Sequence, residues 1–236
     1  MPLVLWFRAM WLVTSQKNGV SALTLQRTLG LGSYETAWTW LHKLRRTMIR
    51  RGRDRLAGDV EVDEAFIGGL AEGGYGWDSE GKALVVIAAQ AEGNGIGRIR
   101  LRRISDASAE NLHGFIEASV EPGALVRTDG WAGYTGIDKK GYQHEVCILK
   151  GKGRDAATTL LPRVHRVASL LKRWLLGTHQ GATRENQLDY YLDEYCFRFN
   201  RRKSASRGKL FYRLVQQAVQ IEPHPYSMLI HPERYR

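Results

Sequence analysis

Two aspartates, Asp63 and Asp129, are the residues whose types and positions best suit chemistry. Asp63 lies in the stretch DVEVDEAFIG, whose other members are largely apolar, with Glu61 and Glu64 adding negative charge. A carboxylate in such a strand is costly unless something pairs with it. Asp129 follows the apolar ALVRT at the start of a Gly-rich turn, where open sheets present ligand-binding groups. Alone, each is more often a cap or turn former. Together they supply the two acids that a divalent-metal site needs.

We expect the third member of this site on the helix that begins at Pro162. His165, Ser169 and Lys172 are spaced by four and three residues, so they share one face beside the apolar stripe. That face lies at the edge of the core, where a cleft would form. The alternative is that His165 is a surface histidine between Arg163 and Arg166.

The hydrophobic period predicts the elements that must position these residues. Alternating or buried apolar runs predict strands at 59–68, 82–92, 97–104, 124–129 and 142–148. Asp106 or Ser108 can cap a helix that runs through Val120. Gly-rich loops follow residues 67 and 149. Three strands, a helix and two strands form the order expected of a mixed α/β sheet with an RNase H-like core.

The first 55 residues predict a helix-turn-helix. Residues 3–16 read as one helix, Ser21 can cap a second that Gly30 ends, and Ser33 can cap a third. In this layout the later helix enters the major groove. We expect Tyr34, Glu35 and Thr36 to face bases and a basic series to follow them: Lys43, Arg45 and Arg46, with more arginines as far as Arg55. A plain helical hairpin is the alternative.

Three further helices are expected at 162–177, 184–199 and 207–219, with an irregular tail. The predicted domains are a helix-turn-helix segment at 1–55, a catalytic core at 56–205, and a C-terminal helix and tail at 206–236. No apolar run is long enough to cross a bilayer, and two cysteines supply neither a CxxC pair nor a disulfide framework. We therefore expect a cytoplasmic protein without a membrane partner.

Charge is unevenly divided along the chain. Residues 1–55 hold ten Lys and Arg against two acids, residues 56–148 hold eight against fifteen, and residues 149–236 hold seventeen against seven. Basic ends favour a polyanion, because each Lys or Arg that meets a phosphate releases condensed counterions. The acidic middle would repel the same partner unless cations bind there. A merely solvated, charged surface is the alternative.

Four segments together resemble the insertion-sequence 1595 family of bacterial transposases: VDEAFIGG around Asp63, RTDGWAGY around Asp129, VHRVASLLKRWLLGTHQG, and YLDEYCFRFNRR. The resemblance extends from the helix-turn-helix to about residue 205. It implies an RNase H-like fold with two aspartates, a third residue on a late helix, which is Glu, Asn or His, and a lysine seven positions later. Carried over, these are Asp63, Asp129, His165 and Lys172. The family usually carries an N-terminal zinc ribbon, which we expect this chain to have lost or to have encoded upstream.

The resemblance implies cleavage of a DNA strand at an element end, followed by attack of the freed 3′-hydroxyl on target DNA. Asp63, Asp129 and His165 would hold two divalent ions, Mg²⁺ or Mn²⁺, with the imidazole favouring Mn²⁺ or Zn²⁺. Lys172 would contact a phosphate near the terminus. A homo-oligomer on double-stranded DNA, near the nucleoid, is expected. The DNA backbone would be held further out by Arg198, Arg201, Arg202 and Lys203.

Two aromatic residues could stack on a flipped base, Trp131 and Trp174, although burial in the core is the stronger expectation for Trp174. Two other activities stay open. One is a catalytically inactive DNA-binding remnant, or a repressor of the parent element. The other is a structure-specific nuclease that cuts but never joins.

Overall fold

The computed structural model describes residues 2–50, 52–68, 82–147, 160–180 and 185–230. The chain forms two compact units, one from Asp54–Arg173 and the other from Met1–Arg53 together with Trp174–Arg236. The sequence had predicted one core over 56–205, whereas the structure groups the residues from Trp174 onward with the N-terminal helices. The reason is long-range packing, because helix α7 (Leu188–Asn200) contacts α3 (Tyr34–Arg46).

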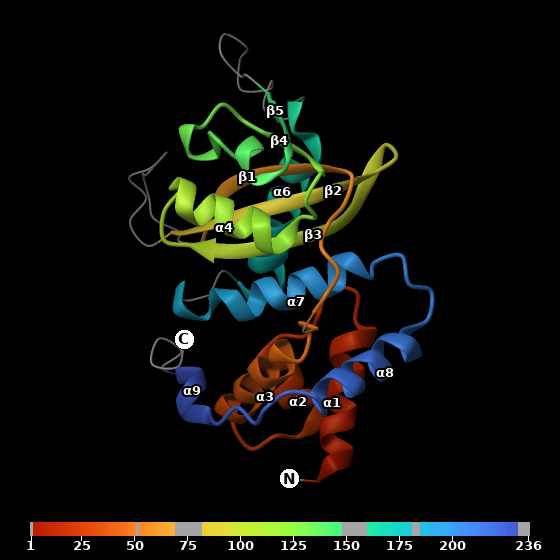
Figure 1. The fold of residues 1–236 in the computed structure, drawn as a ribbon. Coiled ribbons are helices and arrows are strands. Elements are labelled where there is room, and N and C mark those ends of the chain that lie inside the picture. The colour runs from red at the N-terminus through yellow and green to blue at the C-terminus, as the bar shows by residue number, and fades with distance from the viewer. Residues whose placement is uncertain (1, 51, 69–81, 148–159, 181–184, 231–236) are drawn as a thin grey trace. The chain divides into compact units, whose positions relative to one another are not determined.

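A five-stranded mixed sheet forms the centre of the 54–173 unit (Figure 1). Its strands are β1 (Asp59–Ile67), β2 (Ala83–Glu92), β3 (Gly95–Ile104), β4 (Leu125–Thr128) and β5 (Gln143–Val146), in the order β3-β2-β1-β4-β5. β1, β2 and β3 pair antiparallel, whereas β4 pairs parallel with β1 and β5 pairs parallel with β4. This is the RNase H-like arrangement that the order of elements had predicted.

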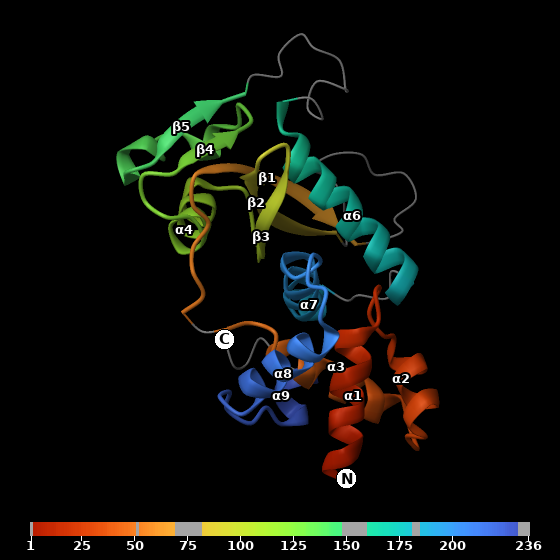
Figure 2. The same ribbon diagram turned by 90° about the vertical axis from the view of Figure 1, so that its right-hand side faces the viewer.

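The two faces of β1 have different neighbours because side chains alternate along a strand. Val60 and Val62 are fully buried in a core with Phe115 and Ile116 of α4 (Ala109–Ser119), whose first turn is capped by the predicted Ser108. The opposite face carries Glu61 and Asp63. Figure 2 shows the first part of α6 (Pro162–His179) on the side of the sheet away from α4.

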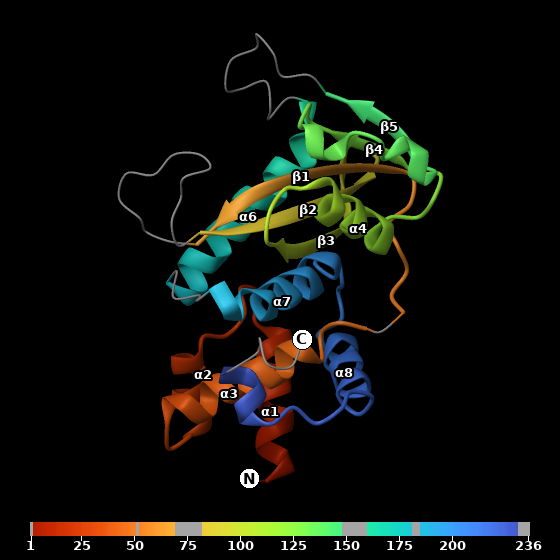
Figure 3. The ribbon, with the colours of Figure 1, turned by 60° about the vertical axis from the view of Figure 1, so that its left-hand side comes forward.

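The other unit is helical (Figure 3). It contains α1 (Leu3–Ser15), α2 (Ala22–Leu29), α3, α7, α8 (Arg207–Ala218), the short α9 (Tyr226–Ile230), and a 3₁₀ turn at Glu185–Gln187. The tail expected to be irregular therefore includes one helical turn, where Leu229 is fully buried.

The predicted caps of the helix-turn-helix are present. Ser21 accepts a hydrogen bond from the Thr24 N–H, Ser33 accepts one from the Thr36 N–H, and Gly30 ends α2 in the left-handed conformation. The core of this unit joins α1 to α3 through stacked indoles of Trp6 and Trp40, whose centroids are 3.9 Å apart. Within the described ranges, no helix combines the length and apolarity that a membrane crossing requires.

Candidate active site

The parallel pairing of β1 with β4 brings Asp63 and Asp129 to the same level. Glu61 of β1 pairs in register with Arg127 of β4. Each aspartate follows two residues later, Asp63 within β1 and Asp129 just after β4. β4 ends at Thr128, and Asp129 begins the turn that follows, where its Oδ1 accepts a hydrogen bond from the Trp131 N–H at 3.0 Å. The negative charge of Asp129 contributes to raising the pKa of Asp63, as expected for neighbouring carboxylates.

His165 lies on α6 with its Nε2 3.6 Å from Oδ2 of Asp63. Burial lowers the pKa of His165 below 6.5, although the charges of Glu61 and Asp129 act in the opposite direction. The imidazole is therefore neutral near pH 7 and keeps one ring nitrogen free to bind a cation. The structure thus brings together the three residues that the sequence singled out from separate segments.

Asp63 is surrounded by negative charge. Its side chain is 17% exposed, and no described Lys or Arg forms an ion pair with it. Burial, followed by the charges of Glu64 and Asp129, raises the pKa of Asp63 from 3.8 to about 8. Burial also raises the pKa of Glu64, although Tyr134 donates a 2.6 Å hydrogen bond to its Oε2. An added cation would relieve this repulsion.

The raised pKa of Asp63 predicts how the metal-free protein responds to pH. The folded state holds the Asp63 proton more tightly than the unfolded state, so the stabilisation is complete below pH 3.8 and is lost as the pH rises through 8. We expect Asp63→Asn to remove this dependence. At pH 8.5 without metal, it should raise the melting temperature by about 5 °C. Calorimetry at pH 5 and pH 8.5 checks this, and a variant that melts at or below the wild-type temperature at pH 8.5 would contradict it.

Glu61 fixes the start of α6 to β1. Its carboxylate is 1% exposed and accepts hydrogen bonds from the backbone N–H groups of Arg163 (2.7 Å) and Val164 (2.9 Å). The Arg163 guanidinium also pairs with Glu61 at 2.8 Å and donates to the carbonyls of Gly93 and Gly95. A carboxylate on the first N–H groups of a helix is favourable, because those groups have no partner within the helix. His165 lies two residues beyond this anchor.

Glu61→Gln should therefore disturb both stability and the position of His165. The substitution leaves Arg163 without its charge partner, which we expect to lower the free energy of unfolding by about 3 kcal/mol. The rate of metal-dependent DNA cleavage should also fall in this variant, because the His165 imidazole is no longer held beside Asp63. Calorimetry and a cleavage assay measure the two effects. Glu121→Gln removes the same charge from an exposed position and should change neither; equal effects of the two variants would refute the positioning role.

Sequence reasoning had noted Glu61 only as added charge and had missed Arg163 and Tyr134 as parts of this site. A signal for Glu61 was present, because it is two residues from Asp63 and so shares its strand face. Lys172 is exposed on α6, seven residues after His165, and its contact with DNA stays a prediction. The Gly-rich loops of 69–76 and 150–159 lie outside the described residues.

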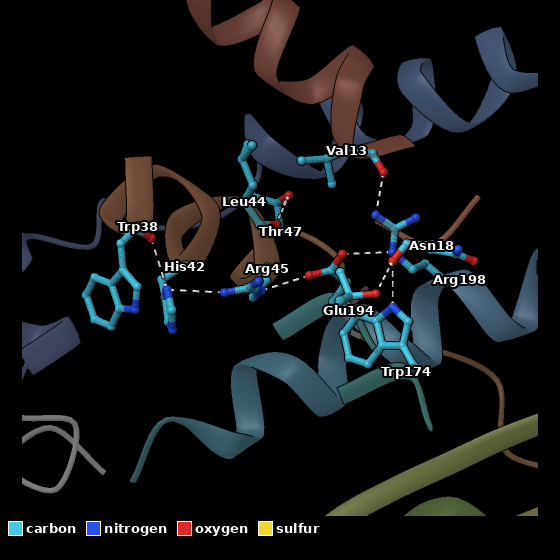
Figure 4. Close-up of polar contacts among 11 residues, drawn as sticks. Val13, Asn18, Trp38, His42, Leu44, Arg45, Thr47, Trp174, Glu194 and Arg198 are labelled. Carbon is cyan, nitrogen blue, oxygen red and sulfur yellow. Dashed lines mark hydrogen bonds and ion pairs between the residues drawn. The ribbon is translucent and has the colours of Figure 1, made fainter. Parts of the chain in front are cut away.

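Two arginines predicted to bind DNA lie inside the helical unit instead (Figure 4). Arg45 is 1% exposed, and its Nε donates to Glu194 at 2.8 Å, with its guanidinium over the Tyr191 ring. Arg198 pairs with the same carboxylate at 2.7 Å and donates to the carbonyls of Val13 and Gln16. Neither guanidinium is free for phosphate, because both pair with the Glu194 carboxylate in the interior.

The other predicted DNA contacts are more accessible. Tyr34 is 54% exposed, Lys43 and Arg46 are half-buried, and Thr36 shares a hydrogen bond with Ser33. The remaining three lie at the end of α7 or just after it. Arg201 and Arg202 place their guanidinium groups over the rings of Phe197 and Phe199, and Lys203 is exposed.

The two tryptophans differ in their surroundings. Trp174 packs against His179 and Tyr195 and donates to the Asn18 carbonyl at 2.7 Å, which agrees with the structural role favoured for it. Trp131 is 40% exposed two residues after Asp129, and its indole N–H donates to the Ala107 carbonyl at 2.8 Å. Stacking of Trp131 on a base stays a prediction.

Solved structures similar to this chain have low sequence identity to it. The catalytic core domain of BIV integrase is 13% identical, with a TM-score of 0.41, over 70% of this chain and 99% of that one. A simian T-cell lymphotropic virus intasome in complex with PP2A regulatory subunit B56 gamma is 12% identical, with a TM-score of 0.43, over 92% and 77%. A pre-cleavage Mos1 transpososome is 11% identical, with a TM-score of 0.34, over 93% and 79%. These similarities are too low to assign an activity.

No curated protein sequence is significantly similar to this chain. The family comparison is decisive, because the ISXO2-like transposase domain matches residues 55–200, which is more than half of the chain. The match includes both aspartates, His165 and Lys172. The chain therefore belongs to the family of ISXO2-like transposase domains.

Proposed function

We propose that this transposase cleaves a DNA strand at an insertion-sequence end and joins the freed 3′-hydroxyl to target DNA. The observation that carries the proposal is the half-buried Asp63 carboxylate, whose Oδ2 lies 3.6 Å from Nε2 of the His165 imidazole and which interacts electrostatically with Asp129. Asp63 and Asp129 both lie in residues 56–148, the acidic part of the chain, which has a basic segment on either side.

Asp63, Asp129 and His165 fit a divalent cation in donor chemistry and in charge. Two carboxylates and an imidazole nitrogen suit Mn²⁺, and less closely Mg²⁺. Burial, followed by repulsion from Glu64 and Asp129, raises the pKa of Asp63, and a bound cation would offset both causes. Within the described residues, no group of three His, Cys, Asp or Glu side chains has the spacing of a complete metal site. We propose these three residues as the ligands because of their donor chemistry, and we expect binding to draw them closer together.

The bound cations would lower the barrier by stabilising charge on the attacking and leaving oxygens. The chain's own residues have other tasks. Burial lowers the pKa of His165, which favours the neutral imidazole, so one of its ring nitrogens carries a lone pair that can bind a cation. Tyr134 holds Glu64 through its hydroxyl, and Glu61 fixes the helix that carries His165. Lys172 would bind a phosphate beside the reacting group, and basic residues near the end of α7 would hold the backbone further out.

An assay of cutting and joining tests the proposal. A labelled duplex carrying the DNA that flanks the gene is incubated with Mn²⁺ and a target plasmid, and the products are separated by size. We expect nicked duplex followed by label joined to the plasmid. Nicked duplex without joined product would indicate a structure-specific nuclease. A sequence-specific shift without nicking under any ion would indicate a DNA-binding remnant or repressor.

A further inference from the structure

The helical unit contains a pocket that the catalytic proposal does not use. Its volume is about 330 Å³, within the range of small-ligand sites. The pocket is lined by residues of the first turns of α3, of the start of α7 with the 3₁₀ turn before it, and of the short helix α9, which contacts α3. Six of its lining residues carry the argument: the aromatic Tyr34, Trp38, Tyr191 and Tyr226, and the polar Glu35 and Gln187.

The inner aromatic walls of this pocket are fixed by the buried network behind them. The Trp38 ring lies against the His42 imidazole, with centroids 3.9 Å apart (Figure 4). The Tyr191 ring is 5% exposed and has the Arg45 guanidinium 4.0 Å from its centroid. Tyr34, which is 54% exposed, forms an accessible outer wall. Rigid aromatic walls favour a flat ligand, because stacking needs no rearrangement of the protein.

The polar groups of the pocket are hydrogen-bond acceptors. The Gln187 side chain donates from Nε2 to the Leu229 carbonyl at 2.6 Å, and the residue is 7% exposed. Its Oε1 is buried and has no hydrogen-bond partner in the described structure. Glu35 accepts a hydrogen bond from the Tyr226 hydroxyl, which raises the pKa of Tyr226. A buried acceptor without a donor is costly, and Gln187 Oε1 has almost no accessible surface, so a ligand that brings an N–H group would have to turn this side chain toward the pocket to relieve that cost.

We propose that this pocket binds an unpaired nucleobase that carries an exocyclic amine, such as cytosine or adenine. The inference rests on the proposed action on DNA and adds a binding site for a base outside the duplex. A nucleobase supplies a flat ring for the aromatic walls and an amine for the two acceptors. An organic cation would meet the same carboxylate, but the Arg45 guanidinium behind Tyr191 disfavours a second positive charge there.

Two matched oligonucleotides test the base preference. Hexamers of deoxycytidine and deoxyuridine differ only in the amine or carbonyl at C4 and in the N3 position beside it. We expect the wild-type chain, without divalent metal, to bind the cytosine hexamer about tenfold more tightly by fluorescence anisotropy. Glu35→Gln should remove most of this preference, and the exposed Glu222→Gln, which makes the same charge change, should keep it. Tyr34→Ala should weaken binding of both hexamers, because it removes a stacking wall.

Equal affinity of the wild type for the two hexamers, or an unchanged preference in Glu35→Gln, would overturn the proposal. Displacement of the cytosine hexamer by methylguanidine at equal concentration would overturn it as well, because the pocket would then be a cation site. The result of this binding test can be distinguished from the result of the cleavage test of the proposed function. Selective binding by a chain that does not cleave DNA supports the pocket and contradicts the catalysis, whereas cleavage without selectivity contradicts the pocket alone.

Discussion

Asp63→Asn is expected to reduce Mn²⁺-dependent strand cleavage by about a thousandfold or more. The substitution keeps the shape of the side chain but replaces the carboxyl group that lies 3.6 Å from His165 with an amide, which cannot ionise. An amide binds divalent cations far more weakly than a carboxylate does. DNA affinity should be nearly unchanged, because the loss of one acidic charge does not weaken contacts to phosphates. Single-turnover cleavage and gel-shift titration measure the two quantities.

The matched control is Asp138→Asn, at an exposed aspartate in the same unit. It should cleave at the wild-type rate. Retained cleavage in Asp63→Asn would refute the active site. Loss of DNA binding in Asp63→Asn would show that the substitution acts through the fold rather than through the chemistry.

The second large effect, a loss of stability, is expected from substitution of Glu194. This carboxylate is 1% exposed between two guanidinium groups, so Glu194→Gln leaves Arg45 charged and unpaired in the interior (Figure 4). Breaking such a buried pair costs roughly 3–5 kcal/mol. We expect the melting temperature of the helical unit to fall by about 10 °C or more, measured by calorimetry.

The stabilisation that Glu194 provides should depend on pH in one direction. Burial would raise the pKa of Glu194, but Arg198 and Arg45 together lower it from 4.5 to about 2. Its stabilisation is therefore complete above pH 4.5 and is lost as the pH falls toward 2. Glu194→Gln should lack this acid-dependent loss.

The neighbouring Asp193 provides a contrast on the same helix. Burial raises its pKa to about 7, so its neutral form is favoured, and Asp193→Asn should leave stability unchanged or raise it. Equal destabilisation by the two substitutions would contradict the role assigned to Glu194.

The sequence predicted the sheet, and the proximity of Asp63 to His165, better than it predicted the surroundings of the basic residues. Alternation in β1 and the apolar run of β2 are local signals, and so are the Ser caps at 21, 33 and 108. Asp63, Asp129 and His165 could be singled out as candidates because each has an unusual position within its own segment. Their convergence follows from the strand order, which places β4 beside β1.

Arg45 and Arg198 were misassigned because their partner is distant in the chain. A basic run looks the same whether its members face water or a buried carboxylate 149 residues away. One local signal was available, because Leu41, Leu44, Arg45 and Met48 have helical spacing and place Arg45 on the buried face of α3. The grouping of α7 with the N-terminal helices had no comparable local signal, since it depends on tertiary packing.

Titration of Mn²⁺ into the metal-free protein, followed by calorimetry, tests the central claim most directly. We expect saturable binding that weakens by about tenfold or more in each of Asp63→Asn, Asp129→Asn and His165→Ala, and that is unchanged in Asp138→Asn. Wild-type affinity in all three variants, or no binding by the wild type in the presence of DNA, would contradict a cation site formed by these residues.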